Sequence, residues 1–240
     1  MIGMLYWHYY LLGIILLPGI LLGAYAQTKV NSTYSTFSKI NAKCGRTAGE
    51  VARLLLDTAG LQNVKLTTAQ GQMADYYDPT KKVVALSGTN STSVASIAIA
   101  AHEVGHALQY KTKYFPIYIR TAAIKLSNFS SSMLLPLVII SLLCNFWLFP
   151  TSSFGTILLW INVGFFGLST LISLVTLPVE YNASKRATKV LQQSGILVGE
   201  ENTYAKKMLI AAALTYVASL LISILSLLRI LILVFQFNRD

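Results

Sequence analysis

The chain has few of the groups from which most soluble enzymes build their surfaces and sites. Only 12% of its 240 residues are charged, against about 25% in soluble domains. Two cysteines, Cys44 and Cys144, exclude a disulfide framework, and we expect both to be free thiols. There are nine acidic residues and three histidines, which leaves few possible catalytic centres. Because 54% of the residues are hydrophobic, a large part of the chain is expected to lie in lipid.

Four apolar stretches approach the roughly 20 residues that a helix needs to cross a bilayer. They run over Met1–Ala26, about Met133–Phe149, about Phe154–Leu177 and about Met208–Phe235, and they predict four transmembrane helices. The first stretch could instead be a signal peptide, since the segment at Ala24–Ala26 resembles a cleavage site. No Lys or Arg precedes it, so an uncleaved anchor is the prediction.

The formal net charge of +10 comes from Lys and Arg residues that gather between the apolar stretches. This distribution indicates membrane topology and not a nucleic-acid partner. Twelve of the 19 Lys and Arg residues lie between Lys29 and Lys125, and five lie between Lys185 and Lys207. Cytoplasmic loops carry an excess of such residues. The distribution therefore predicts that both basic segments lie in the cytoplasm and both termini outside. No nucleic-acid partner is expected.

The segment between the first two stretches shows a mixed α and β pattern. Ser35–Thr58 is predicted as a helix that ends before Gly60. Asn63–Thr67 and Lys82–Ser87 have β-prone patterns and predict a two- or three-stranded antiparallel sheet. Ser91–Tyr110, which begins with the capping residues Thr92 and Ser93, is predicted as the next helix.

That last helix contains the pentapeptide HEVGH, with His102 and His106 four residues apart. Residues at this spacing project from the same face of a helix, so both imidazoles can bind one metal ion, and Glu103 can hold the water that the ion activates. The pattern is typical of zinc peptidases. A glycine inside a helix costs about 1 kcal/mol relative to alanine, so Gly105 predicts close approach by a neighbouring or substrate backbone. The alternative is an amphipathic helix that carries these residues by chance.

A catalytic zinc needs three protein ligands and one open position. We expect Glu180 to be the third ligand because it directly follows an apolar stretch, where an acid is costly unless it is paired or metal-bound. Pro178 fits a helix start or a kink at this point. The alternative is an interfacial acid paired with Lys185 or Arg186. Other candidate ligands are His8, Asp57, Asp75 and Asp78.

Three segments closely resemble the YugP-like family of membrane zinc metallopeptidases: Ala74–Lys82, Ala101–Gln109 and Leu177–Ala187. The resemblance implies a zinc peptidase with an HExxH helix and a later glutamate ligand. More distantly, the segment from Glu180 to Ser184 is similar to the E-x-x-x-D segment of CAAX prenyl proteases. There the Glu binds zinc and the Asp supports a ligand; this chain has Ser184 in place of that Asp. It also has Tyr76 where the family has a histidine, so no role of that histidine carries over.

The expected fold is a mainly α integral membrane protein. It would have four transmembrane helices and a zincin-like cytoplasmic α+β catalytic region with a small sheet. The expected parts are an N-terminal anchor (1–26), a catalytic region (27–132), two transmembrane helices (133–177), a cytoplasmic segment with the third ligand (178–207), and a C-terminal transmembrane helix and tail (208–240).

The expected function is zinc-dependent cleavage of peptide bonds at the cytoplasmic surface of a bacterial-type plasma membrane. Zn²⁺ would be held by His102, His106 and Glu180, with Glu103 as general base. The expected partners are a peptide or membrane-protein substrate and the lipid bilayer, while the oligomeric state is left open. Tyr181 and Tyr204 are candidates for the oxyanion donor.

Two other functions stay open at this point. A site-2-type intramembrane protease is suggested by the small, apolar Ser93–Tyr110 segment, although no Asn-Pro-Asp-Gly-like motif follows it. A zinc-binding membrane scaffold without proteolysis is the other, although structural zinc would need no base such as Glu103.

Val83–Ser87 is predicted as an edge strand that pairs with extended substrate, or else as an ordinary strand. Gly19 and Gly23 fit a small-residue packing motif, within the chain or in a dimer.

Overall fold

The computed structural model describes residues 13–144, 148 and 154–237, without the side chains of 125–131 and 236–237. The chain divides into two compact units, each built from separate stretches. The first unit comprises Met1–Tyr25, Tyr118–Leu177 and Tyr216–Asp240, and the second comprises Ala26–Ile117 and Pro178–Thr215. In chain order the elements are α2 (Leu17–Phe37), α3 (Ala48–Thr58), β1 (Lys65–Thr68), β2 (Tyr76–Asp78), β3 (Val83–Leu86), α4 (Val94–Lys111), α5 (Phe115–Leu143), α6 (Phe154–Gln193) and α7 (Glu200–Phe237).

The region predicted as one helix over Ser35–Thr58 contains two helix segments. Helix α2 ends at Phe37 and α3 begins at Ala48, so the prediction is wrong for the residues between them. Thr47 explains the second start: its hydroxyl accepts from the Glu50 backbone N–H, while the Glu50 carboxylate accepts from the Thr47 backbone N–H. This reciprocal cap begins a new helix. The predicted end before Gly60 is confirmed, with Gly60 at φ +67°.

The sheet has three strands in the order β1-β3-β2. Strand β3 pairs in parallel with β1, with Lys65 opposite Val83, and antiparallel with β2, with Tyr77 opposite Val84. The prediction of a purely antiparallel sheet is therefore wrong, and so is the prediction that Val83–Ser87 forms an edge. Strand β3 is central because it is the most apolar strand: Val84, Ala85 and Leu86 are all buried.

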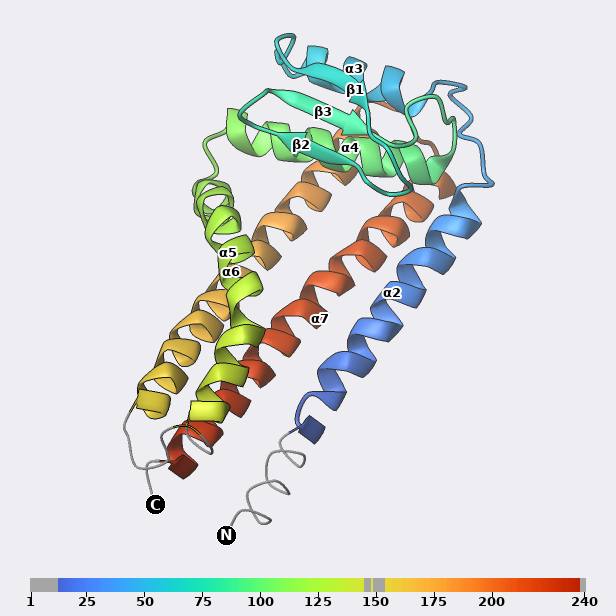
Figure 1. Ribbon diagram of the computed structural model, residues 1–240. Coiled ribbons are helices and arrows are strands. Elements are labelled where there is room, and N and C mark those ends of the chain that lie inside the picture. Colours follow the sequence, from blue (N-terminus) through green and yellow to red (C-terminus); the bar gives the residue numbers. More distant parts are fainter. Residues whose placement is uncertain (1–12, 145–147, 149–153, 238–240) are drawn as a thin grey trace. The chain divides into compact units, whose positions relative to one another are not determined.

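Helix α4 is the best buried element of the second unit. It packs against α3 and contacts β2 and β3, and Figure 1 shows it running beside the sheet. Its predicted cap is confirmed, since the Ser93 hydroxyl accepts from the Ser96 backbone N–H at 3.2 Å. Mostly small side chains allow this close packing; the apolar residues of α4 that are 0% exposed are Val94, Ala95, Ile97, Ala98, Ala100, Ala101 and Val104. A rigid, enclosed helix therefore carries the HEVGH motif.

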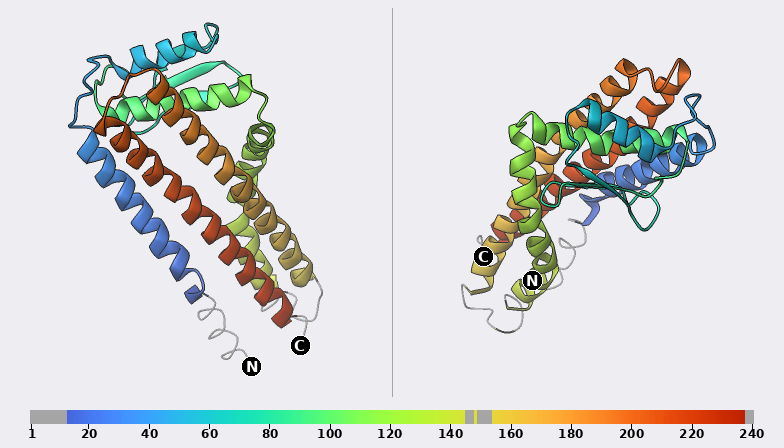
Figure 2. Two further views of the ribbon diagram at one scale, coloured as in Figure 1. Left: turned by 180° about the vertical axis from the view of Figure 1, so that it is seen from behind. Right: turned by 90° about the horizontal axis from the view of Figure 1, so that it is seen from above.

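The prediction of four transmembrane helices is wrong. In the described part of the chain, two helices are long and apolar enough to cross a membrane: α6 over Phe154–Gln193 and α7 over Glu200–Phe235. Both helices can be traced in Figure 2 by the colours of the sequence bar. Among the described residues, the predicted second span forms the shorter apolar helical stretch Ser132–Leu143, which falls short of about 20 residues; residues 145–147 and 149 of that span lie outside the described residues. Residues 1–12 of the predicted first span lie outside the described residues, and the helix that follows continues into a polar sequence as far as Phe37.

Within the first unit, the small residues near the start of α2 pack inside the chain. A Cβ atom added to Gly19 would lie 2.8 Å from Ile222 Cγ1, and one added to Gly23 would lie 3.6 Å from Ile222 Cδ1. Of the two uses left open for this motif, packing against α7 of the same chain is the one observed.

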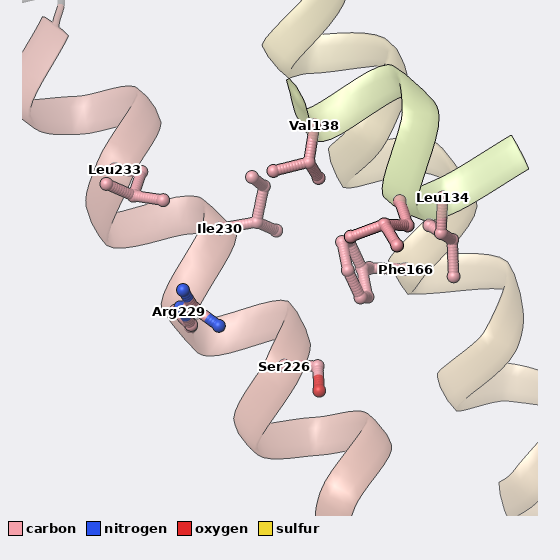
Figure 3. Close-up of a pocket in the computed structure, with 8 residues that line it drawn as sticks. Leu134, Val138, Phe166, Ser226, Arg229, Ile230 and Leu233 are labelled. Carbon is pink, nitrogen blue, oxygen red and sulfur yellow. The ribbon is translucent and has the colours of Figure 1, made fainter. Parts of the chain in front are cut away.

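The first unit also has a partly open pocket, and the arginine of the fourth apolar stretch is one of its lining residues. Arg229 and Ser226 face it from α7, and Figure 3 shows apolar side chains from α5, α6 and α7 around it. The lining residues are Leu134, Leu135, Val138, Phe166, Ser226, Arg229, Ile230 and Leu233. The guanidinium is thus accommodated without breaking α7.

Candidate metal centre

The two histidines of HEVGH lie next to each other on α4. His102 and His106 are one helical turn apart, and their ring centroids are 4.8 Å apart with the planes at 86°. His106 is only 6% exposed and His102 is partly buried. The predicted shared face is therefore observed, and both rings are held inside the second unit.

Glu180 joins these rings from α6, 78 residues further along the chain. Its Oε2 atom lies 3.1 Å from His102 Nε2 and 3.5 Å from His106 Nε2. The carboxylate is 1% exposed. Among the described residues, His102, His106 and Glu180 form the group of possible metal ligands whose ligand atoms all lie within 4.8 Å of one another. The structure thus brings together the three residues predicted to bind zinc.

The spacing of these atoms suits zinc. Four ligands at 2.0–2.1 Å in a tetrahedral arrangement lie about 3.3 Å from one another, close to the 3.1 Å and 3.5 Å observed here. Two imidazoles and one carboxylate are also a ligand set that catalytic zinc uses, with the fourth position left for water.

The carboxyl group of Glu180 is held in its anionic form. Glu180 lies in the second unit, beyond the part of α6 that belongs to the apolar first unit. Burial alone would raise its pKa, but the hydrogen bond with the His102 ring and the proximity of the His106 ring outweigh that effect, so the pKa lies below its usual value. An ionised carboxylate is the form that binds a cation.

Glu103 occupies α4 directly after His102 and is 7% exposed. It is not a member of the three-residue cluster. It is therefore a buried acid that belongs to the same helix turn as the cluster but does not add a fourth ligand to it. Its predicted role as general base stays a prediction.

The other predicted ligand candidates have local partners instead. Asp57 pairs with Arg53 at 2.7 Å. Asp75 accepts from the Ser87 backbone N–H and hydroxyl, and Asp78 accepts from the backbone N–H groups of residues 80 and 81. His8 lies outside the described residues.

Neither tyrosine that could serve as an oxyanion donor has a contact that assigns it to the cluster. The Tyr204 hydroxyl donates to Glu200 at 2.6 Å, which raises the tyrosine pKa, and its ring stacks on Phe37 at 4.9 Å. Tyr181 is 66% exposed. The oxyanion donor therefore stays unassigned.

Two polar residues contact the Nδ1 atoms of the histidine rings: Gln109, which the sequence did not single out, and Ser184, which stands in place of the ligand-supporting Asp of the E-x-x-x-D segment. The Nδ1 atom of His106 lies 3.0 Å from Gln109 Oε1, and the Nδ1 atom of His102 lies 3.1 Å from Ser184 Oγ. Gln109 follows His106 by three residues, a spacing that places both on one helix face. That spacing was the available signal. For Ser184 the signal was its place in the E-x-x-x-D-like segment, and the tertiary structure identifies His102 as its partner.

Comparisons with known proteins identify the family of the chain. A family described as "putative neutral zinc metallopeptidase" matches residues 12–235. The "Putative membrane protease YugP" of Bacillus subtilis (strain 168) is 37% identical over 221 residues, which cover 91% of this chain and 94% of that protein. No solved structure matches the chain. Because the family model covers residues 12–235 and the relative covers 91% of the chain, the chain belongs to this family.

Proposed function

We propose that the protein is a zinc-dependent endopeptidase that works at the surface of a membrane. The observation that carries this proposal is the convergence of His102 Nε2, His106 Nε2 and Glu180 Oε2 at separations that suit tetrahedral zinc. The family description and the name of the Bacillus relative support the same activity.

In this proposal three residues of the chain bind the ion and a fourth residue transfers a proton. His102, His106 and Glu180 would hold the zinc and leave one side of it open. When bound, zinc would lower the pKa of a coordinated water towards about 7 and polarise the scissile carbonyl. Glu103, beside His102, would accept the proton of the attacking water and deliver it to the leaving amine.

The exposed edges of the sheet give an extended substrate a place to pair. With β3 in the centre, the edges are β1 and β2. Of these, β2 contacts α4, and its Tyr77 ring lies 5.7 Å from that of Tyr110 on α4. Strand β2 therefore takes the substrate-pairing role first predicted for β3.

Two observations support a location at the cytoplasmic membrane surface. Helices α6 and α7 form a pair of apolar segments, and the chain between their apolar parts carries five of the 19 Lys and Arg residues, from Lys185 to Lys207. The positive-inside rule places such a connection in the cytoplasm, together with Glu180. Helix α4 is not among the described helices that are apolar enough to span a membrane, which favours a surface site over an intramembrane one.

The test is a measurement of zinc content together with hydrolysis of labelled casein by the full chain in detergent. The wild type is expected to hold about one zinc per chain, to lose activity to a chelator and to regain it with zinc. The double variant His102→Ala, His106→Ala should hold almost none. Full zinc occupancy in that variant would disprove the site. Zinc-loaded wild type that never cuts a peptide bond would favour a zinc-binding scaffold.

A further inference from the structure

Gln109 is a fully buried amide that contacts both helices of the metal centre. It is 0% exposed. Its Oε1 atom lies 3.0 Å from His106 Nδ1, and its Nε2 atom lies 2.7 Å from the backbone oxygen of Val179 and 3.1 Å from Asn182 Oδ1. The side chain thus uses one acceptor and two donors, on α4 and α6 together.

The orientation of this amide is fixed by two independent acceptors. The Val179 carbonyl oxygen can only accept a hydrogen bond. Asn182 Oδ1 also accepts from Arg186 Nε at 2.7 Å, and because a guanidinium only donates, the oxygen of Asn182 must be the atom on this side. The NH₂ group of Gln109 must therefore face these two acceptors. Its Oε1 atom then necessarily faces His106.

This orientation determines the protonation pattern of the His106 ring. Gln109 Oε1 can only accept, so a hydrogen bond at 3.0 Å requires a proton on His106 Nδ1. In a neutral imidazole the other nitrogen, Nε2, then carries a lone pair. That is the atom that lies 3.5 Å from Glu180 Oε2. A metal ligand needs this unprotonated nitrogen.

We propose that Gln109 is a positioning residue that holds His106 as the Nδ1–H tautomer, with the Nε2 lone pair directed at the metal site. The same amide ties α4 to α6 at Val179, which directly precedes Glu180, and at Asn182, which follows it by two residues, and so keeps His106 in register with Glu180. This inference rests on the proposed function, since it assigns a role toward zinc.

The Nδ1 atom of the other histidine has no partner of fixed hydrogen-bond direction. The partner of His102 Nδ1 is the Ser184 hydroxyl, at 3.1 Å, and a hydroxyl can either donate or accept. Ser184 is therefore compatible with both tautomers of His102. The two rings therefore differ at Nδ1: Gln109 requires a proton on that atom of His106, whereas Ser184 requires none on that atom of His102.

The test compares two substitutions that separate the acceptor of Gln109 from its two donors. Gln109→Met keeps the length of the side chain but removes both functions. Gln109→Glu keeps an acceptor for His106 but has no N–H group to donate to the Val179 carbonyl oxygen or to Asn182 Oδ1. Gln192→Met is the matched control, because Gln192 is an exposed glutamine on α6. Zinc affinity is measured on the full chain in detergent by chelator competition, and the tautomer by ¹H–¹⁵N correlation of histidine side chains in metal-free protein.

In the wild type, the His106 signals are expected to show a protonated Nδ1. Gln109→Met should lower zinc affinity about 10–100-fold, the usual effect of removing a partner behind a metal ligand, and should mix the tautomers of His106. Gln109→Glu should keep the Nδ1–H tautomer of His106 and bind zinc more tightly than Gln109→Met. It should unfold at a lower temperature than the wild type, because the two donated hydrogen bonds are lost. The control should match the wild type.

Three outcomes would overturn the inference. One is a wild-type His106 protonated on Nε2, which can be read even if the variants fail to fold. The second is unchanged zinc affinity in Gln109→Met. The third is an equal loss of zinc affinity in Gln109→Met and Gln109→Glu, which would show that Gln109 only holds α4 and α6 together and does not set the tautomer of His106. A wild type that binds no zinc would instead refute the proposed function, so the two failures are distinguishable.

Discussion

The backbone of Ala183 on α6 occupies the space that a side chain of residue 105 on α4 would need. A Cβ atom built on Gly105 would lie 2.6 Å from the Ala183 carbonyl oxygen and 3.2 Å from its carbonyl carbon. Backbone atoms cannot move aside as the end of a flexible side chain can. The predicted close approach at Gly105 is therefore observed, and the neighbour is the helix that carries Glu180. The absence of a side chain here allows the two halves of the metal centre to meet.

Gly105→Ala should destabilise the protein and weaken zinc binding together. Overpacking of this kind costs about 1–3 kcal/mol, and separation of α4 from α6 moves Glu180 away from both histidines. Thermal unfolding and chelator competition measure the two effects. Gly167→Ala is the matched control, because a Cβ atom at that helical glycine meets nothing within 4 Å. Equal stability and zinc affinity in Gly105→Ala and the wild type would show that the helices can separate without harm.

Glu103→Gln should leave zinc binding near the wild-type level while hydrolysis falls by about 10²–10⁴-fold, the usual contribution of a general base. The amide keeps the size of the side chain but cannot take a proton from water. Zinc content and the initial rate of casein cleavage are measured on the same preparation. If this variant cleaves as fast as the wild type, another group is the base.

The connection between α6 and α7 should be accessible from the cytoplasm only. A cysteine at Ser194, which is exposed, can be labelled in a chain that lacks Cys44 and Cys144. A membrane-impermeant maleimide should miss Ser194→Cys in intact cells and label it after permeabilisation. Labelling in intact cells would place the metal centre on the other face of the membrane.

Acid should remove the contribution of the α3 cap to stability. Hydrogen bonds from the Thr47 backbone N–H and hydroxyl lower the pKa of Glu50 below its usual value. A carboxyl whose pKa is lower in the folded state stabilises that state above its unfolded pKa, and the effect is lost as the pH falls through the folded value. Glu50→Gln should therefore show a shallower loss of stability below about pH 4.5 than the wild type, measured by denaturant unfolding. Parallel curves would mean that the cap does not depend on the charge.

Local patterns in the sequence were sufficient for features that depend on a few neighbouring residues. The spacing of His102 and His106 fixes their common face because a helix repeats every 3.6 residues. The cap at Ser93, the end before Gly60 and the β-prone strands follow from the same short-range preferences. Hydrophobicity alone was less reliable over longer stretches. It identified the apolar parts of α6 and α7, but it overestimated the number of transmembrane helices, because apolar runs also arise in helices too short to cross a bilayer.

The tertiary structure decided every feature that joins distant parts of the chain. The order of the strands depends on which strand lies in the centre with neighbours on both edges. The residues of one strand alone do not determine this. Glu180 was identified from its unusual position beside an apolar stretch, yet its distance from His102 is set by the packing of α4 on α6 at Gly105 and Ala183. The orientation of Gln109 depends on Val179, Asn182 and Arg186 together. Such contacts form only when the chain folds, because hydrogen-bond direction and close packing are properties of atoms brought together in space, which sequence spacing does not encode.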